Sequence, residues 1–186
     1  MARQLETSRT ILRAWRDGDV EEWVALGADA RVMEFMPSLI ERADAERSAQ
    51  RLREGLERDG YGWWVLEVKD VASFAGVVAL QNVPSDLPFT PAFEVGWRLR
   101  YDQWGRGYAT EAARAALDFA FDELGHSEVV ALTAAINLRS QAVMERLGMT
   151  RDPRDDFEHT RLEPGHRLRP HVLYRIRNAT GDARGT

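Results

Sequence analysis

Short runs of β-branched, aromatic and other apolar side chains, bounded by turn-forming or charged residues, predict seven strands along this chain. Runs of this length and composition are typical of strands in a buried or half-buried sheet. Three of them follow one another with short connections, which favours antiparallel pairing. The predicted strands are residues 10–15, 61–69, 74–82, 92–99, 128–136, 156–160 and 171–177.

Four other segments repeat their apolar residues every three or four positions, which is the period of a helix with one buried face. The first begins at Asp19, three residues before Glu22, in a spacing like that of a capping box. The third is apolar on most sides, which predicts a helix covered by its neighbours. The first helix is expected to start at residue 19, and the other three are expected to span residues 43–58, 107–124 and 138–147. Strands and helices in this order predict the α/β (α+β) class with a mixed, mostly antiparallel sheet.

All these elements fall within residues 10–177, and a chain of 186 residues fits one domain with one core. Residues 1–9 are expected to form an N-terminal extension. Residues 178–186 are small and polar, so we expect a flexible tail.

Charge and composition narrow the possible partners. The chain has 25 basic and 30 acidic side chains, and a net charge of -5 repels a phosphate backbone, so nucleic acid is not an expected partner. No segment is long and apolar enough to cross a membrane, and no signal peptide is recognisable, so we expect a cytoplasmic protein without a membrane partner. The chain has no cysteine, and its histidines lack the helical spacing of a metal pair, so no metal is expected.

The connection between the fourth predicted strand and the largely buried helix carries the first sign of a ligand. Gly105 and Gly107 allow a ligand to approach the backbone closely, and the following helix presents free N–H groups and the positive end of its dipole. A pyrophosphate suits such a site, although a tight turn before a helix would use the same glycines. A Walker loop is excluded because no Gly-Lys-Ser/Thr occurs, and a dinucleotide fingerprint fits poorly at Thr110.

Residues 104–112, Trp-Gly-Arg-Gly-Tyr-Ala-Thr-Glu-Ala, resemble the coenzyme A loop of the GNAT acetyltransferase superfamily, especially its ribosomal-protein N-terminal acetyltransferase branch. Residues 137–149 resemble the second signature, an Asn-x-x-Ser helix closed by glycine, and residues 93–99 resemble the family's central strand. The resemblance implies a GNAT-like domain with a six- to seven-stranded sheet flanked by four helices. It also implies an acyltransferase that moves an acetyl group from acetyl-CoA to a primary amine of a small molecule or a protein N-terminus.

The resemblance further implies where acetyl-CoA binds. Backbone amides of the loop would hold the pyrophosphate, and the strand around Trp97 and Leu99 would pair with the pantetheine arm. Asn137 is expected to cap its helix and to touch this arm as well. The residues implied in cosubstrate binding are Trp97, Leu99, Trp104, Gly105, Arg106, Gly107, Tyr108, Ala109, Thr110, Asn137 and Ser140.

Acetyl transfer needs a base for the amine and a proton for the departing thiolate. Many family members place a tyrosine donor where this chain has Met144, so Ser140 is the candidate acid, with a helix-start serine bonded to backbone as the alternative. Glu94 is the candidate base, because it lies on the strand that resembles the family's central strand, near where the resemblance implies a base, and a carboxyl group beside an apolar wall has a raised pKa. A glutamate that faces solvent or pairs with arginine, with water relaying the proton, is the alternative.

The acceptor site is expected between Glu94, Phe35 and His159. Core packing of Phe35 and a solvated hairpin around His159 are the alternatives. Five arginines with Glu163 as the only local acid predict a basic patch, which is either an ordinary solvated surface or a guide for an acidic acceptor or the coenzyme's phosphates. They are Arg161, Arg167, Arg169, Arg175 and Arg177. A non-catalytic acyl-CoA-binding module remains the alternative function, and we expect a monomer or a homodimer.

Overall fold

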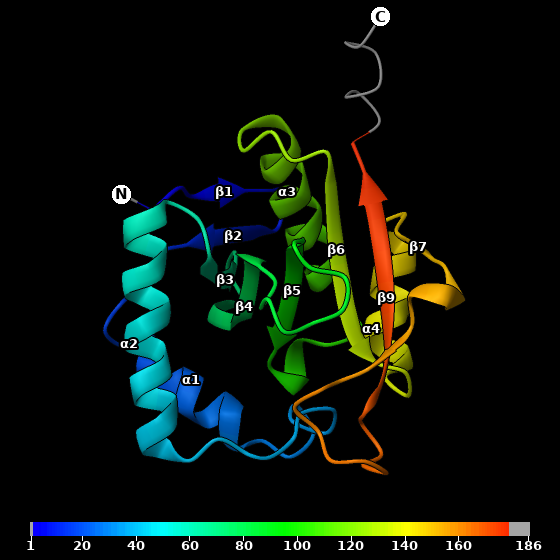
Figure 1. Ribbon diagram of the computed structural model, residues 1–186. Helices are drawn as coiled ribbons and strands as arrows, with labels where there is room; N and C mark the ends of the chain where they lie inside the picture. Colours follow the sequence, from blue (N-terminus) through cyan, green and yellow to red (C-terminus); the bar gives the residue numbers. More distant parts are fainter. Residues whose placement is uncertain (1, 179–186) are drawn as a thin grey trace, which may run out of the picture.

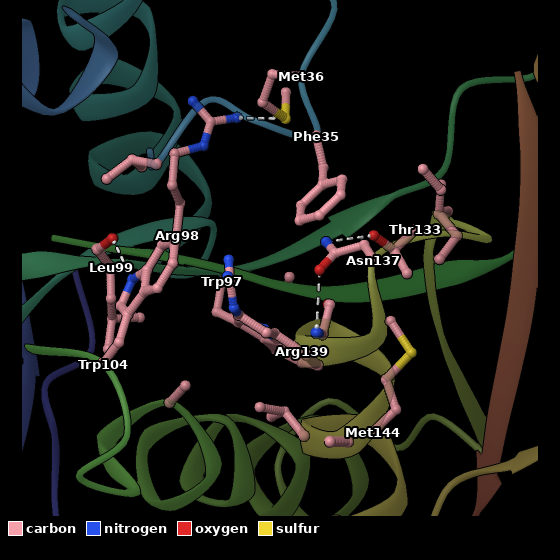
Figure 2. Close-up of a pocket in the computed structure, with 18 of the residues that line it drawn as sticks. Phe35, Met36, Trp97, Arg98, Leu99, Trp104, Thr133, Asn137, Arg139 and Met144 are labelled. Atoms are coloured by element: carbon pink, nitrogen blue, oxygen red, sulfur yellow. Dashed lines mark hydrogen bonds between the residues drawn. The ribbon is translucent and has the colours of Figure 1, made fainter. Parts of the chain in front are cut away.

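The computed structural model describes residues 2–178, which form one open sheet with helices on its two faces (Figure 1). Helices α1 and α2 lie on one face, and α3 and α4 lie on the other (Figure 2). The four helices are α1 (Asp19–Ala28), α2 (Arg42–Asp59), α3 (Tyr108–Asp122) and α4 (Leu138–Arg146). No helix in this part of the chain is long and apolar enough to cross a membrane.

Nine strands pair in the order β1-β2-β3-β4-β5-β6-β9-β7, with β8 also paired to β9. All pairs are antiparallel except β5 with β6. The strands are β1 (Leu5–Glu6), β2 (Thr10–Arg13), β3 (Trp63–Val68), β4 (Ala72–Asn82), β5 (Phe93–Leu99), β6 (Glu128–Ala134), β7 (Thr150–Arg151), β8 (Phe157–Glu158) and β9 (Pro170–Arg177).

The predicted class, the mixed sheet and the four helices are confirmed, but the sheet has nine strands in the described residues instead of six or seven. Strands β1 and β7 have two residues each, too few to show any alternation in the sequence. Strand β1 pairs with β2 and belongs to the segment expected to precede the domain. Most of the expected flexible tail, residues 179–186, lies outside the described residues.

The core lies on both faces of the central strands. Residues 77–80 of β4 are almost completely buried, which explains why this strand is continuously apolar. Helix α3 packs alanines against the sheet, and these small side chains let the helix backbone approach the strands closely: Ala112, Ala113, Ala116 and Ala120. The sheet and α3 therefore form a rigid support for the loop that precedes α3.

The start of α1 differs from the capping box predicted from the sequence. Asp19 is the first residue of the helix, Gly18 is the cap, and no side chain makes a capping hydrogen bond. The buried Asp19 carboxylate instead accepts two hydrogen bonds from Arg13, at 2.7 and 3.0 Å, and one from the N–H of Arg16 at 2.6 Å. A two-pronged bond to a buried guanidinium is stronger than a bond to a helix N–H, so Asp19 joins α1 to β2.

Strands β5 and β6 are parallel neighbours that separate along their length. They pair at a single register position, Glu94 opposite Val130, although β5 pairs with β4 from Phe93 to Leu99 on its other edge. Strand β6 likewise pairs along its whole length with β9. Figure 1 shows β5 and β6 diverging toward their carboxyl ends. The inner edges of the two strands are consequently free of strand partners beyond Glu94.

Replacing Asp19 with alanine is expected to lower the free energy of unfolding by about 3 kcal/mol or more, because buried Arg13 would lose a carboxylate partner. Asp17 is a matched control, since it pairs with Arg53 at 2.8 Å with its side chain 96% exposed. Asp17→Ala should lower the unfolding free energy by less than about 1 kcal/mol. Urea denaturation compares the two variants, and equal losses would show that Asp19 does not anchor α1.

Candidate active site

A cleft of about 1190 Å³ lies where β5 and β6 separate, and both faces of the sheet contribute to its lining. We call its two parts the α3/α4 half and the α1/α2 half, after the helices on each side. The first is lined by residues 105 and 107–110, Asn137, Ser140 and Met144; the second by Phe35, Met36, Glu94, Gly96, Arg98 and His159. The cleft exceeds the size of ordinary small-ligand pockets, so it can hold two ligands that meet between the strands.

The loop before α3 forms an anion site in the α3/α4 half. Gly105 and Gly107 have φ angles of 72° and 81°, in the left-handed region that glycine adopts without strain. Among the described residues, the backbone N–H groups from Gly105 to Thr110 have no hydrogen-bond acceptor. These groups lie at the positive end of the α3 dipole, so the loop is suited to bind phosphate oxygens.

Trp104 fixes this loop to the end of β5. Its indole N–H donates to the backbone oxygen of Leu99 at 2.9 Å (Figure 2), and its ring lies 5.1 Å from that of Tyr101. The carbonyl of Leu99 is therefore occupied, while the inner edge of β5 around Trp97 has no strand partner. An amide-bearing chain can pair with this edge as an added strand would.

The predicted capping of α4 by Asn137 is confirmed. Asn137 Oδ1 accepts the N–H of Ser140 at 3.2 Å, and its amide nitrogen donates to Thr133 Oγ1 at 2.9 Å (Figure 2). The Ser140 hydroxyl belongs to the cleft lining and has no hydrogen-bond partner among the described residues. Met144 lies buried beside it, and its thioether has no proton to give. Ser140 is thus the hydroxyl that this helix turn presents to the cleft.

Glu94 lies at the junction of the two halves, at the one position where β5 still pairs with β6. Burial raises the pKa of its carboxyl group, and a hydrogen bond from the Gln81 amide, 3.1 Å from Oε2, opposes that shift. Within the described residues the side chain of Glu94 bonds only to Gln81 and forms no ion pair, so the expected alternative of an arginine partner is absent there. Such a carboxyl group can accept a proton at neutral pH more readily than an exposed one.

Phe35 and His159 come from segments far apart in sequence and line the same half of the cleft as Glu94. The His159 ring lies 4.8 Å from that of His171, and burial lowers the pKa of both imidazoles. Both rings therefore favour the neutral form at neutral pH. Among the described residues, no group of three or more acidic or histidine side chains can hold a metal ion.

Arg106 contributes to the loop through its backbone N–H, as the resemblance implies, and not through its side chain. Its side chain is exposed and does not line the cleft, although its carbonyl accepts a hydrogen bond from Arg9 at 3.1 Å. Every other residue predicted for cosubstrate or acceptor binding lines the cleft.

The predicted basic patch is wrong, because four of its five arginines pair with acids from other segments. Arg161 pairs with Asp86 at 2.9 Å, and Arg169 pairs with Glu158 at 2.8 Å. Arg175 and Arg177 share Glu128, and Arg175 also binds Asp155. The fifth, Arg167, donates to the backbone oxygen of Glu34. A count of charges along one segment missed these partners because they are distant in sequence.

The sequence analysis missed three arginines that line the cleft, Arg98, Arg139 and Arg146. Arg139 of α4 has its guanidinium carbon 5.1 Å from the centroid of the Trp104 ring, and it pairs with Glu34, from the segment between α1 and α2, at 3.2 Å. Arg98 of β5 points into the α1/α2 half, toward Met36 (Figure 2). Arg98 could have been found in the sequence, because Glu94, Gly96 and Arg98 alternate with apolar residues along this strand and so lie on one of its faces.

The fold and the cleft define an acyltransferase of the acetyltransferase type. The family model of the acetyltransferase (GNAT) domain matches residues 9–150, and the chain belongs to this family. It is 30% identical over 147 residues to YkkB of Bacillus subtilis, covering 78% of this chain and 84% of that protein. The resemblance inferred from the two sequence signatures is confirmed.

Two further proteins show how far the likeness extends. The chain is 40% identical over 94 residues to FsC-acetyl coenzyme A-N(2)-transacetylase of Aspergillus fumigatus, covering 50% of this chain and only 36% of the fungal protein. The ribosomal-protein-S5-alanine acetyltransferase of Vibrio fischeri has the same fold, with a TM-score of 0.74 over 95% of this chain and 97% of that chain. Its 18% sequence identity supports the fold alone.

Titration of the Glu94 carboxyl group, followed by carbon-13 NMR, is expected to show a midpoint above the ordinary glutamate pKa of about 4.3, because burial disfavours the charged form. Gln81→Leu should raise the midpoint further, since it removes the hydrogen bond that stabilises the carboxylate. A midpoint at or below the ordinary value, or one that falls in Gln81→Leu, would contradict this description of Glu94.

Proposed function

We propose that this protein transfers the acetyl group of acetyl-CoA to a primary amine of a small molecule or of a protein N-terminus. The observation that carries the proposal is the continuity of the cleft, which runs from the glycine loop of α3, along the free edge of β5, to Glu94. A long phosphate-bearing cosubstrate and a separate acceptor can then meet from opposite faces of the sheet.

The α3/α4 half fits coenzyme A in both its charged and its amide-rich parts. The free N–H groups of Gly105 to Thr110 would hold the pyrophosphate. The β5 edge at Trp97 would hydrogen bond with the pantetheine amides, and the remaining amide hydrogen of Asn137 would face the same arm. Bound there, acetyl-CoA supplies an acetyl thioester, and every other task falls to residues of this chain.

Three groups of the chain would then promote transfer. The carboxylate of Glu94 takes a proton from the acceptor's ammonium group, directly or through a water molecule, and the free amine attacks the thioester carbonyl carbon. A backbone N–H on the inner edge of β5 stabilises the oxyanion that forms. As the new C–N bond forms, the C–S bond breaks, and the Ser140 hydroxyl gives its proton to the leaving thiolate. The nitrogen, which is positively charged after the attack, then releases its second proton through water and so restores the Ser140 hydroxyl, which leaves a neutral amide and a free thiol.

The acceptor amine is proposed to enter through the α1/α2 half. Phe35 and Met36 provide an apolar wall, and His159 and Glu94 line the same half of the cleft. The name of the fungal relative, an N(2)-transacetylase, supports a nitrogen acceptor for the family to which this chain belongs. An unhindered primary amine suits a cleft that narrows between two strands.

A non-catalytic acyl-CoA-binding module would need only the α3/α4 half. The carboxyl group of Glu94, with its raised pKa, and the unbonded hydroxyl of Ser140 both line the cleft, and a binding module has no use for either. These two side chains favour catalysis over binding alone.

Release of coenzyme A thiol from acetyl-CoA, measured with a panel of peptide α-amines, lysine peptides and small amines, tests the proposed function. We expect at least one amine to raise thiol release well above a no-amine control, with mass spectrometry showing the acetylated amine. Tight binding of acetyl-CoA without acetylation of any amine would establish the binding module instead.

Gly107→Val is expected to weaken coenzyme A binding by at least about tenfold, or about 1.4 kcal/mol, because a branched side chain would stand where phosphate oxygens approach. Gly125→Val is the matched control, because Gly125 has a similar φ of 74° and lies beyond the other end of α3. Calorimetry on both folded variants makes the comparison. Equal affinities in the two would mean that the loop does not bind the cosubstrate.

Ser140→Ala is expected to lower kcat by roughly 10²- to 10⁴-fold with little change in coenzyme A affinity, because it removes the proton donor to the thiolate. Ser140→Thr keeps a hydroxyl at the same position and should retain much of the activity. Steady-state kinetics under conditions where chemistry limits the rate decides the point. An unchanged kcat in Ser140→Ala would remove Ser140 from the mechanism.

A further inference from the structure

Arg98 is a partly buried cation without an anionic partner among the described residues. Its guanidinium Nη2 lies 3.5 Å from the sulfur of Met36, and its carbon Cζ lies 5.4 Å from the Trp23 ring centroid. Neither neighbour carries a charge that could neutralise the guanidinium. Burial without an anion lowers the pKa of Arg98 to about 10, which leaves it charged at neutral pH.

An unpaired charge in such a place is unfavourable for folding, so its presence calls for a partner that the folded chain lacks. The other arginines that line the cleft do not share this situation, since Arg161 is neutralised by Asp86, Arg139 is neutralised by Glu34, and Arg146 is exposed to solvent. Arg98, in contrast, reaches into the α1/α2 half itself, beside Met36 (Figure 2).

Arg98 lies on the same face of β5 as Glu94, the proposed base. Glu94, Gly96 and Arg98 alternate along β5 and so lie on one face of the strand, with the α-carbons of Glu94 and Arg98 about 13 Å apart. Gly96 has no side chain between them, and a β-carbon there would lie 3.9 Å from Glu94 Oε1. The floor of the cleft between the carboxylate and the guanidinium is therefore open to a ligand.

We propose that Arg98 forms a carboxylate-binding subsite, and that the acceptor is an amine that also carries a carboxylate. The inference rests on the proposed function, with the amine directed to Glu94 and the acid group to Arg98. A guanidinium binds a carboxylate through two parallel hydrogen bonds, so it selects a negatively charged acceptor and also fixes that acceptor's orientation. A single guanidinium matches a singly charged carboxylate, whereas a doubly charged phosphate would leave excess negative charge near Glu94.

Pairs of acceptors that differ only in the carboxylate test the subsite. One arm compares unbranched ω-amino acids with alkylamines of equal length, and the other compares the dipeptides Ala-Asp and Ala-Asn, with the C-terminus of each dipeptide amidated. For the unmodified enzyme, we expect kcat/KM at least about tenfold higher for the carboxylate member in one arm. The arm that shows the preference identifies a free amino acid or a peptide as the source of the carboxylate.

Arg98→Met and Arg98→Lys separate the subsite from a structural role. Arg98→Met should abolish the carboxylate preference, mainly through KM, while alkylamine or Ala-Asn turnover and coenzyme A affinity stay within about twofold. Arg98→Lys keeps the charge without the planar fork and should retain part of the preference. The free energy of unfolding of Arg98→Met should stay equal or rise, because an unpaired charge is replaced by an apolar side chain of similar length.

Two results would overturn the subsite. One is the absence of a carboxylate preference in both arms for an enzyme that acetylates these amines. The other is an Arg98→Met variant that unfolds more easily and loses activity equally toward all acceptors, which would make Arg98 a packing residue against Trp23. Failure of the proposed function looks different, because the unmodified enzyme would then acetylate no amine in either arm.

Discussion

The separation of β5 from β6 beyond Glu94 is the constraint on which the whole site depends. A parallel pair inside a sheet normally continues its hydrogen bonds, and backbone groups left without partners are unfavourable. Here a single register position, Glu94 opposite Val130, holds the pair together, and the inner edges beyond it are open. The opening gives a passage through the sheet, so a cosubstrate on the α3/α4 face and an acceptor on the α1/α2 face can reach one another.

The opening can persist because everything around it is well anchored. Strand β5 is fully paired with β4, and β6 with β9, so each inner edge belongs to a rigid half of the sheet. The buried alanines of α3 bring its N-terminus close to β5, and the bond from Trp104 to the Leu99 carbonyl fixes the loop at that point. In the part of the chain that the structure describes, the loop amides, the inner edge of β5 and the Ser140 hydroxyl have no partner and lie at the cleft. A site on such supports needs little reorganisation when its ligands bind.

Features set by local periodicity and turn chemistry could be predicted from the sequence, and features set by distant partners could not. The helices, the long strands, the glycine loop and the Asn137 cap each depend on a few neighbouring residues. Asp19 was misread because its partner, Arg13, lies on another element, and the arginines of residues 161–177 were misread because Asp86 and Glu128 are remote. Arg98 shows the converse case: its significance lies in a partner that is missing, which only the assembled cleft reveals.

Amide hydrogen exchange with and without saturating acetyl-CoA tests the central claim, that the opened edge of β5 and the loop before α3 together form the cosubstrate channel. The account predicts slower exchange at residues 95–99 and 105–110 in the complex, with the fully paired residues 77–80 of β4 unchanged. Protection confined to other segments, or no change at either stretch in a protein shown to be saturated, would contradict it.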